Sequence, residues 1–404
     1  MTINKEKRYT RNKRPEERNP SGFSLTYLLD MEGKKGTQDM KKRKAAGMLI
    51  VLDILILGVV RVCEMLADWY ARRIYPLWTG IIGRILGLFP YSAVECLFYV
   101  LILFVILRTL YRVYKSVVKK ESAVIHLKQA GENIVLGIAI LFTLYTWMCG
   151  INYQRESFAD IYQMQQKQYT AEELKEASKR LLADVNRYAK SVERDANGIM
   201  ILGKGKRGAV LNDSGRNAVR AMQALGEECS ELEGFYPIPK GLMVSEILSY
   251  QNLTGVYSPF TIEANYNADM PDYNIPFTMC HELLHLKGFM QEEEANFIAY
   301  LGCERSKEEA FRYSGALLGW LYCSNELYAY DKEAYRELEA KLCEEAVVDL
   351  NENNRFWDAY KGKIAKTAQK VNDAYLKANG QTEGVESYDR VTDLLVQHLL
   401  RKNR

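Results

Sequence analysis

The sequence has little net charge, few histidines and no paired cysteine motif. Its 54 Lys and Arg exceed its 51 Asp and Glu by only three, which gives no reason to expect nucleic-acid binding, because that needs concentrated positive charge. None of the eight cysteines stands in a C-x-x-C spacing. We interpret the five beyond residue 151, namely Cys229, Cys280, Cys303, Cys323 and Cys343, as small buried residues rather than as a disulfide framework or a thiolate metal site. The 404 residues leave room for more than one domain.

Long apolar runs, by contrast, occur three times before residue 152, at 45–66, 92–111 and 133–151. Each is close to the ~20 residues that a helix needs to cross a bilayer. About 44 hydrophilic residues precede the first run, so it is not a cleaved signal peptide. The sequence predicts a membrane domain with three transmembrane helices over 45–151. We expect the Trp- and Tyr-containing segment 68–91 to lie along the membrane interface.

The flanking charges predict how the chain crosses the membrane. Residues 1–44 carry 13 Lys and Arg against 6 Asp and Glu, which indicates a disordered basic tail. This tail and the basic loop at 108–128 should be cytoplasmic, so three crossings place residues 152–404 outside the cytoplasm of a multi-pass cell-membrane protein. Asp53 is costly inside the first span and should face another helix. If 45–66 instead lay on the surface, residues 152–404 would share the side of the tail.

The part after the spans has mixed patterning and then becomes helical. Residues 169–193 predict an amphipathic helix in which Thr170 and Glu173 have capping-box spacing. Short runs typical of strands follow at 208–213, 241–245 and 259–267. Pro276 is the last proline of the chain, and helical patterning dominates after it. We expect a small strand-containing lobe followed by a helical one.

Two of the four histidines stand four residues apart in "CHELLH". Such a string arises by chance on the order of a few times per thousand chains of this composition. On a helix, His281 and His285 share one face, about 6 Å apart, so both imidazoles can reach one zinc ion at ~2.1 Å. Glu282 is rotated about 100° from His281 and is placed for a general base. The sequence predicts a zinc site, with a histidine pair that binds nothing as the alternative.

Local signals define the helix that carries this motif. Asn274 is expected to cap it, Pro276 suits its first turn and Gly288 should end it. A catalytic zinc site needs a third protein ligand, and a second predicted helix opens with three glutamates at 292–294. The motif lies about 130 residues beyond the last predicted span in a polar segment, so an intramembrane protease is not expected.

The string "EEEAN" at 292–296 resembles the E-x-x-A-(N/D) string of the gluzincin clan of zinc peptidases, whose third ligand is a glutamate on a following helix. This resemblance implies Glu292 as the ligand and leaves Glu293 and Glu294 on a solvated or supporting acidic face. Gln291 stands where the third histidine of metzincins would be, which argues against that subgroup.

More of the chain resembles a family of uncharacterised membrane proteins with three N-terminal spans and an outer H-E-x-x-H domain. The residues that carry this resemblance are "PFTIEAN" (259–265), "MCHELLHLKGF" (279–289), "EEEANF" (292–297) and "YLKANGQTEGVESYDRV" (375–391). The resemblance implies a zinc peptidase and names no substrate. The expected fold is a mainly α membrane protein whose three N-terminal transmembrane helices precede an α+β zincin-like outer domain with a helical C-terminal lobe.

The predicted function is a membrane-anchored zinc metallopeptidase that acts on peptides or proteins, with Zn²⁺ on His281, His285 and Glu292 and Glu282 as the base. The alternative is a metal-binding membrane sensor or assembly factor. The 259–267 strand is a candidate for pairing with an extended substrate. Tyr388, and after it Arg390, is the candidate for stabilising the oxyanion. The sequence assigns no role to His126 or His398 and does not indicate an oligomeric state.

Overall fold

A computed structural model describes residues 25–120, 122–164, 169–381 and 390–401. The chain divides into two compact units, Met1–Leu52 with Arg112–Ile140, and Asp53–Tyr111 with Leu141–Arg404.

Three helical stretches are long and apolar enough to cross a membrane: Met40–Val62, Ala93–Val117 and His126–Gln154. The expectation of a membrane protein with three candidate spans is therefore confirmed at the level of length and composition. Within the first unit, Arg43 forms an ion pair with Glu132 at 2.7 Å, and Lys42 donates a hydrogen bond to Asn133 at 2.8 Å.

Helix α1 covers Leu25–Val62. Residues 25–44, for which we expected no regular structure, are thus helical. Their Leu, Met, Lys and Gln residues have high helix propensity and extend a helix already formed by the apolar run. Asp53 is completely buried in the second unit and accepts a hydrogen bond from the Thr143 hydroxyl at 2.6 Å. It faces another helix, as expected of a carboxylate in a span.

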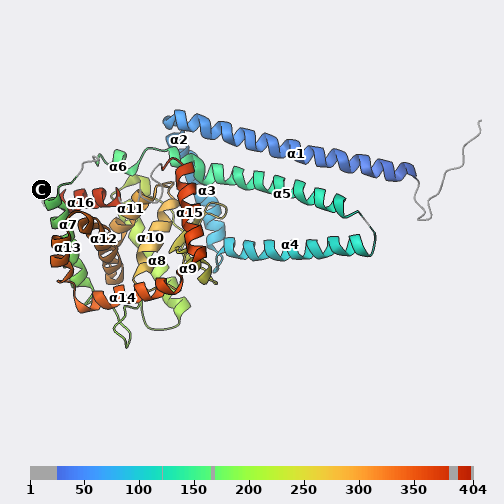
Figure 1. Ribbon diagram of the computed structural model, residues 1–404. Helices are drawn as coiled ribbons and strands as arrows, with labels where there is room; N and C mark the ends of the chain where they lie inside the picture. The colour runs from blue at the N-terminus through green and yellow to red at the C-terminus, as the bar shows by residue number, and fades with distance from the viewer. Residues whose placement is uncertain (1–24, 121, 165–168, 382–389, 402–404) are drawn as a thin grey trace, which may run out of the picture. The chain divides into compact units, whose positions relative to one another are not determined.

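The second unit is mainly helical (Figure 1). Between the first two spans lie α2 (Glu64–Trp69), a π-helical turn (Tyr70–Ile74) and α3 (Tyr75–Gly87), followed by α4 (Ala93–Val117). The third span contains α5 (Ala123–Tyr145), a π-helical turn (Thr146–Gly150) and a 3₁₀ turn (Ile151–Gln154). The remaining helices are α6 (Phe158–Ile161), α7 (Ala171–Tyr188), α8 (Arg207–Gly226), a 3₁₀ turn (Ser230–Leu232), α9 (Glu246–Gln251), α10 (Asn274–His285), α11 (Glu292–Arg305), α12 (Glu309–Tyr330), α13 (Lys332–Glu339), α14 (Glu344–Ala359), α15 (Lys363–Ala378) and α16 (Val391–Arg401).

The described residues contain one small sheet of three strands in the order β1-β3-β2, where β1 is Lys240–Gly241, β2 is Gly255–Ser258 and β3 is Glu263–Tyr266. β1 runs parallel to β3, and β2 runs antiparallel to it. Residues 208–213, predicted as strand-like, belong instead to α8. Leu211 of this segment and its neighbours Ala218 and Met222 belong to a buried helical stripe, and burial of that stripe overrides the local preference.

Helix α7 carries the expected capping box: Thr170 Oγ1 accepts from the Glu173 amide at 3.1 Å, and the Glu173 carboxylate accepts from the Thr170 amide at 2.8 Å. The motif helix α10 starts one residue earlier than expected, since Tyr273 takes the cap position and Asn274 is its first residue. Asn274 donates to Asn353 at 2.9 Å instead of capping.

Helix α10 lies in the middle of the second unit, where it packs against α8, α11, α12 and the central strand β3 (Figure 1). Neighbouring elements therefore cover most of α10, and Met279, Leu283 and Leu284 are completely buried. Such burial fixes the directions of the motif side chains, because a helix in a packed core cannot rotate without opening cavities.

Candidate metal centre

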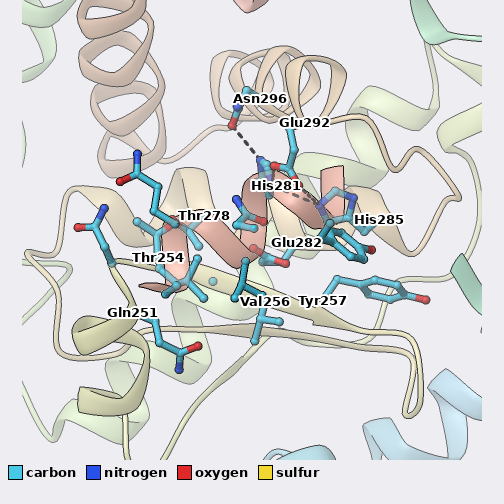
Figure 2. Close-up of a pocket in the computed structure, with 18 of the residues that line it drawn as sticks. Gln251, Thr254, Val256, Tyr257, Thr278, His281, Glu282, His285, Glu292 and Asn296 are labelled. Carbon is cyan, nitrogen blue, oxygen red and sulfur yellow. Dashed lines mark hydrogen bonds and ion pairs between the residues drawn. The ribbon is translucent and has the colours of Figure 1, made fainter. Parts of the chain in front are cut away.

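Three side chains of ligand type converge where α10 meets α11. Helix α10 carries His281 and His285, and α11 begins at Glu292. Gly288, with φ +81°, lets the chain reverse between the two helices. The two Nε2 atoms are 3.2 Å apart, and the oxygens of Glu292 lie 3.3 Å from His281 Nε2 and 4.0 Å from His285 Nε2 (Figure 2). This cluster has the residue types and spacing to hold a metal ion.

The other nitrogen of each imidazole is already engaged. His285 Nδ1 lies 2.8 Å from the carbonyl oxygen of Phe289, and His281 Nδ1 lies 2.9 Å from Asn296 Oδ1. Because a carbonyl oxygen only accepts, each Nδ1 carries the hydrogen, and each Nε2 of a neutral ring presents its lone pair. Two lone pairs and the carboxylate of Glu292 then face one another. Such an arrangement is repulsive unless a proton or a metal cation lies among them.

A proton fills this role in the metal-free chain. Burial lowers the pKa of His281, but the hydrogen bond and the negative charge of Glu292 outweigh burial and raise that pKa to about 9. Burial and the positive charge of His281 lower the pKa of His285 to about 4. The histidine pair therefore holds one positive charge at neutral pH. A metal ion would displace this proton, so its affinity should fall as the pH falls.

Glu282 lies on the side of α10 that faces β2 (Figure 2). Burial raises the pKa of its carboxyl group to about 8, and its Oε2 has no hydrogen-bond partner. The strand comes so close that a Cβ at Gly255 would lie 2.4 Å from Glu282 Oε1 and 2.7 Å from a methyl group of Thr278. A buried carboxyl group with a raised pKa beside the ligand cluster is suited to accept and return a proton.

The cluster opens into a cleft of about 1540 Å³. This is larger than the roughly 300–1,000 Å³ of ordinary small-molecule pockets, so an extended polymer fits. Helix α9, strand β2 and helix α15 contribute to its lining, and the ligand cluster, Glu282 and Asn296 line it as well (Figure 2).

The structure places the remaining acidic residues of α11 away from solvent. Glu293 accepts a hydrogen bond from Gln381 at 2.8 Å, and Glu294 accepts one from the Ala159 amide at 3.2 Å. Both glutamates are buried, so of the two expected alternatives, a solvated or a supporting acidic face, the solvated one is wrong. Neighbouring helices enclose this part of α11. The run of three glutamates in the sequence does not reveal that burial. Arg390 lies 4.0 Å from Glu293 and is not part of the cleft lining.

Tyr388, the leading candidate for oxyanion stabilisation, lies outside the described residues. His398 is 3.1 Å from Glu304, away from the ligand cluster. All eight cysteines are free thiols, so the described residues contain no disulfide.

Sequence reasoning missed three contributors to the site. Asn296 was noted only as part of a string, yet it orients His281. Nothing in the sequence around Gly255, which precedes the β-branched Val256, indicated that this glycine would lie against the motif helix. The strand expected at 259–267 proved to be the central strand β3, buried on both sides, whereas the edge strand that lies along α10 is β2. Strand β3 is central because β1 pairs with its far side, and this leaves β2 at the edge. The two paired strands, β1 and β3, are more than twenty residues apart in sequence.

These observations define a mainly helical protein that has three candidate membrane spans and a partly buried cluster of two histidines and one glutamate at the base of a large cleft. The chain belongs to the DUF3810 family, described as a protein of unknown function, whose profile matches residues 70–396. No curated protein and no solved structure is significantly similar to it.

Proposed function

We propose that the chain is a membrane-anchored zinc-dependent peptidase. The observation that carries the proposal is the convergence of three ligand atoms whose lone pairs require a cation, beside a buried carboxyl group and at the base of a polymer-sized cleft. The sequence motif alone does not supply this argument, because it does not show that the carboxylates of Glu292 and Glu282 lie beside the histidine pair or that a cleft opens there.

The separations of the ligand atoms fit zinc. Ligands at ~2.0–2.1 Å in a tetrahedral arrangement lie about 3.3–3.4 Å from one another. The two Nε2 atoms are 3.2 Å apart, Glu292 Oε2 lies 3.3 Å from His281 Nε2, and Glu292 Oε1 lies 4.0 Å from His285 Nε2. A single ligand atom from each residue gives separations within 4.8 Å, so the carboxylate would have to rotate for one of its oxygens to complete the tetrahedral set. Both Nδ1 atoms donate to carbonyl oxygens, as in most histidine–zinc sites.

A bound zinc ion would supply Lewis-acid activation of water and of a peptide carbonyl group. Glu282 would accept the proton of the attacking water and return it to the nitrogen of the leaving amine. The edge strand β2 lies beside Glu282, and its free edge suits backbone pairing with an extended substrate, the role that the sequence suggested for the neighbouring strand. We infer that α10 under this small sheet forms a zincin-like arrangement.

Metal analysis of the full-length chain in detergent tests the ligand set. We expect about one equivalent of zinc in the wild type and less than about a tenth in His281→Ala, since two remaining ligands do not hold a catalytic zinc ion. His398→Ala is the matched control, because this histidine pairs with Glu304 outside the cluster; it should retain the metal. Less than about half an equivalent in the wild type contradicts the proposal.

Glu282→Gln tests whether the site is catalytic. It should keep the zinc and lower the hydrolysis of a pooled peptide library by about 10²–10⁴-fold, because the amide cannot take up a proton. Glu333→Gln, on the exposed surface of α13, is the control and should change nothing. If Glu282→Gln supports the cellular role of the chain as well as wild type does, the sensor or assembly-factor function is favoured instead.

We also propose that the cleft faces away from the cytoplasm. Support comes from the basic residues near 1–44 and 108–128 together with an odd number of candidate spans. Reporter fusions after residues 44, 120 and 404 should give cytoplasmic, cytoplasmic and external signals. A cytoplasmic signal at 404 overturns the orientation and leaves the peptidase proposal standing.

A further inference from the structure

The end of the third candidate span lines the same cleft as the ligand cluster. Tyr145, Cys149 and Tyr153 all belong to the last ten residues of His126–Gln154 and contribute to the cleft wall. Cys149 Sγ lies 3.8 Å from Met290 Sδ, in the turn between the two ligand-bearing helices. A residue at the end of a span lies at the surface of the bilayer. The cleft therefore reaches the membrane surface, although the motif is about 130 residues away along the chain.

The motif helix also rests on the segment expected at the membrane interface. On α3, the Tyr75 hydroxyl donates to the carbonyl oxygen of His285 at 3.1 Å and lies 2.9 Å from the hydroxyl of Tyr257 on β2. The other face of α3 exposes large apolar side chains, namely Leu77, Trp78, Ile81 and Ile85. A helix with one face packed on protein and an exposed apolar face containing Trp is typical of the interface. One hydrogen bond thus joins the ligand-bearing helix to that helix.

The second span is tied to the sheet in the same way. Both carboxylate oxygens of Glu263, on β3, accept from the first amides of α4, Ala93 and Val94, at 3.0 Å each. In return, Glu95 on α4 accepts from the amides of Met243 and Val244 at 2.7 and 2.9 Å. Charge-assisted hydrogen bonds of this kind are strong. They tie the start of the span to the sheet, whose strand β2 lines the cleft.

The cleft exposes an apolar lining. Val256 and Phe260, beside the ligand cluster, and Ile364 and Val371 on α15 are 38–64% exposed. Contiguous exposed apolar side chains mark a surface that an apolar partner covers. A polar peptide from the aqueous phase would not bury these apolar side chains against apolar groups of its own. An apolar segment next to a membrane anchor would bury them.

We propose that the substrate is a polypeptide anchored in the same bilayer and cleaved in the extended segment next to its anchor. This inference rests on the proposed peptidase function. The anchor confines the segment to the height of the cleft, which raises its effective concentration, and the apolar lining binds side chains that emerge from the bilayer.

The probe is a pool of quenched fluorescent peptides of mixed sequence, prepared with a palmitoyl group at either end or with none. Zinc-loaded full-length chain in phosphatidylcholine liposomes should cleave the anchored pools at least about 10²-fold faster, the lower limit of the gain expected from tethering. Equal rates for anchored and free pools overturn this inference and leave the peptidase function intact. Cleavage of neither pool overturns the peptidase function itself.

A second variant pair tests the lining. Val371→Asp changes an exposed residue of the cleft wall and should lower cleavage of the anchored pools at least about 10-fold with unchanged zinc content, because a charge opposes an apolar segment. Val347→Asp on α14, also exposed and outside the cleft lining, is the matched control and should have no effect. Equal activity of Val371→Asp and wild type on anchored peptides contradicts the proposed contact.

Discussion

Two clusters of buried polar side chains lie in the same compact unit and differ in their balance of donors and acceptors. In the Asp349 cluster, Arg194 donates to both carboxylate oxygens at 3.1 and 3.0 Å, and the Tyr313 hydroxyl and the Met200 amide donate at 2.5 and 2.8 Å. Its charges cancel and its acceptors are filled. In the ligand cluster, acceptors face acceptors. Burial of polar groups therefore does not by itself mark a functional site. A functional site is marked by an excess of hydrogen-bond acceptors whose mutual repulsion a bound cation relieves.

The largest effect on folding is expected at Asp349. Asp349→Ala removes the buried carboxylate of the pair, leaves the partly buried Arg194 guanidinium without a counter-charge and should lower the free energy of unfolding by about 3 kcal/mol. Denaturant unfolding of the full-length chain in detergent measures this loss. Zinc content per folded molecule should stay at the wild-type level. A parallel loss of zinc would contradict the separation of the two clusters.

The ligand cluster should show the opposite behaviour. With a chelator present, the free energy of unfolding of His281→Ala should be within about 1 kcal/mol of that of wild type. The alanine removes an imidazole whose repulsion with His285 and Glu292 is relieved only by a proton. Zinc at 100 times its dissociation constant should stabilise wild type by about 2.7 kcal/mol and leave the variant unchanged. Thermal unfolding with and without zinc checks both statements. A zinc-dependent stabilisation of His281→Ala would place the metal elsewhere.

A smaller effect is expected where a neutral side chain supports a ligand. Asn296→Ala removes the acceptor that orients His281 and should weaken zinc binding about 10–100-fold. Competition against a chromophoric chelator measures the affinity. Asn296→Asp keeps an acceptor at the same place and should bind zinc at least as tightly as wild type. Equal losses in both variants would show that the Asn296 amide acts through packing alone.

The smallest effect is expected at Glu294. Its carboxylate accepts from the Ala159 amide, so its hydrogen bonding is more complete than that of the ligand cluster and less complete than that of Asp349. Burial, the main cause, raises the pKa of its carboxyl group to about 7. The unfolded chain releases this proton near pH 4.5, so stability should fall as the pH rises from about 4.5 to 7. Glu294→Gln should therefore be more stable than wild type by about 2 kcal/mol near pH 6 and nearly equal to it near pH 4.5. A gain of the same size at both pH values would rule out titration as its cause.

Local pattern was sufficient wherever the interacting residues belong to one helix. The apolar runs predicted the three candidate spans, the Thr170–Glu173 spacing predicted a capping box that the structure contains, and the four-residue spacing placed His281 and His285 on one face. These predictions succeed because the helical repeat converts sequence spacing directly into distance. The family resemblance added Glu292, which the structure brings to both histidines.

Tertiary structure alone decided what surrounds this face. It placed the Phe289 carbonyl and Asn296 behind the imidazoles, buried Glu293 and Glu294, made β2 rather than β3 the edge strand, and brought the end of a span into the wall of the cleft. Tyr75 and His285 are 210 residues apart in sequence and share a hydrogen bond. Contacts of this kind depend on how whole helices and strands pack around a common core, and no periodicity within a single segment records which other segment will cover it.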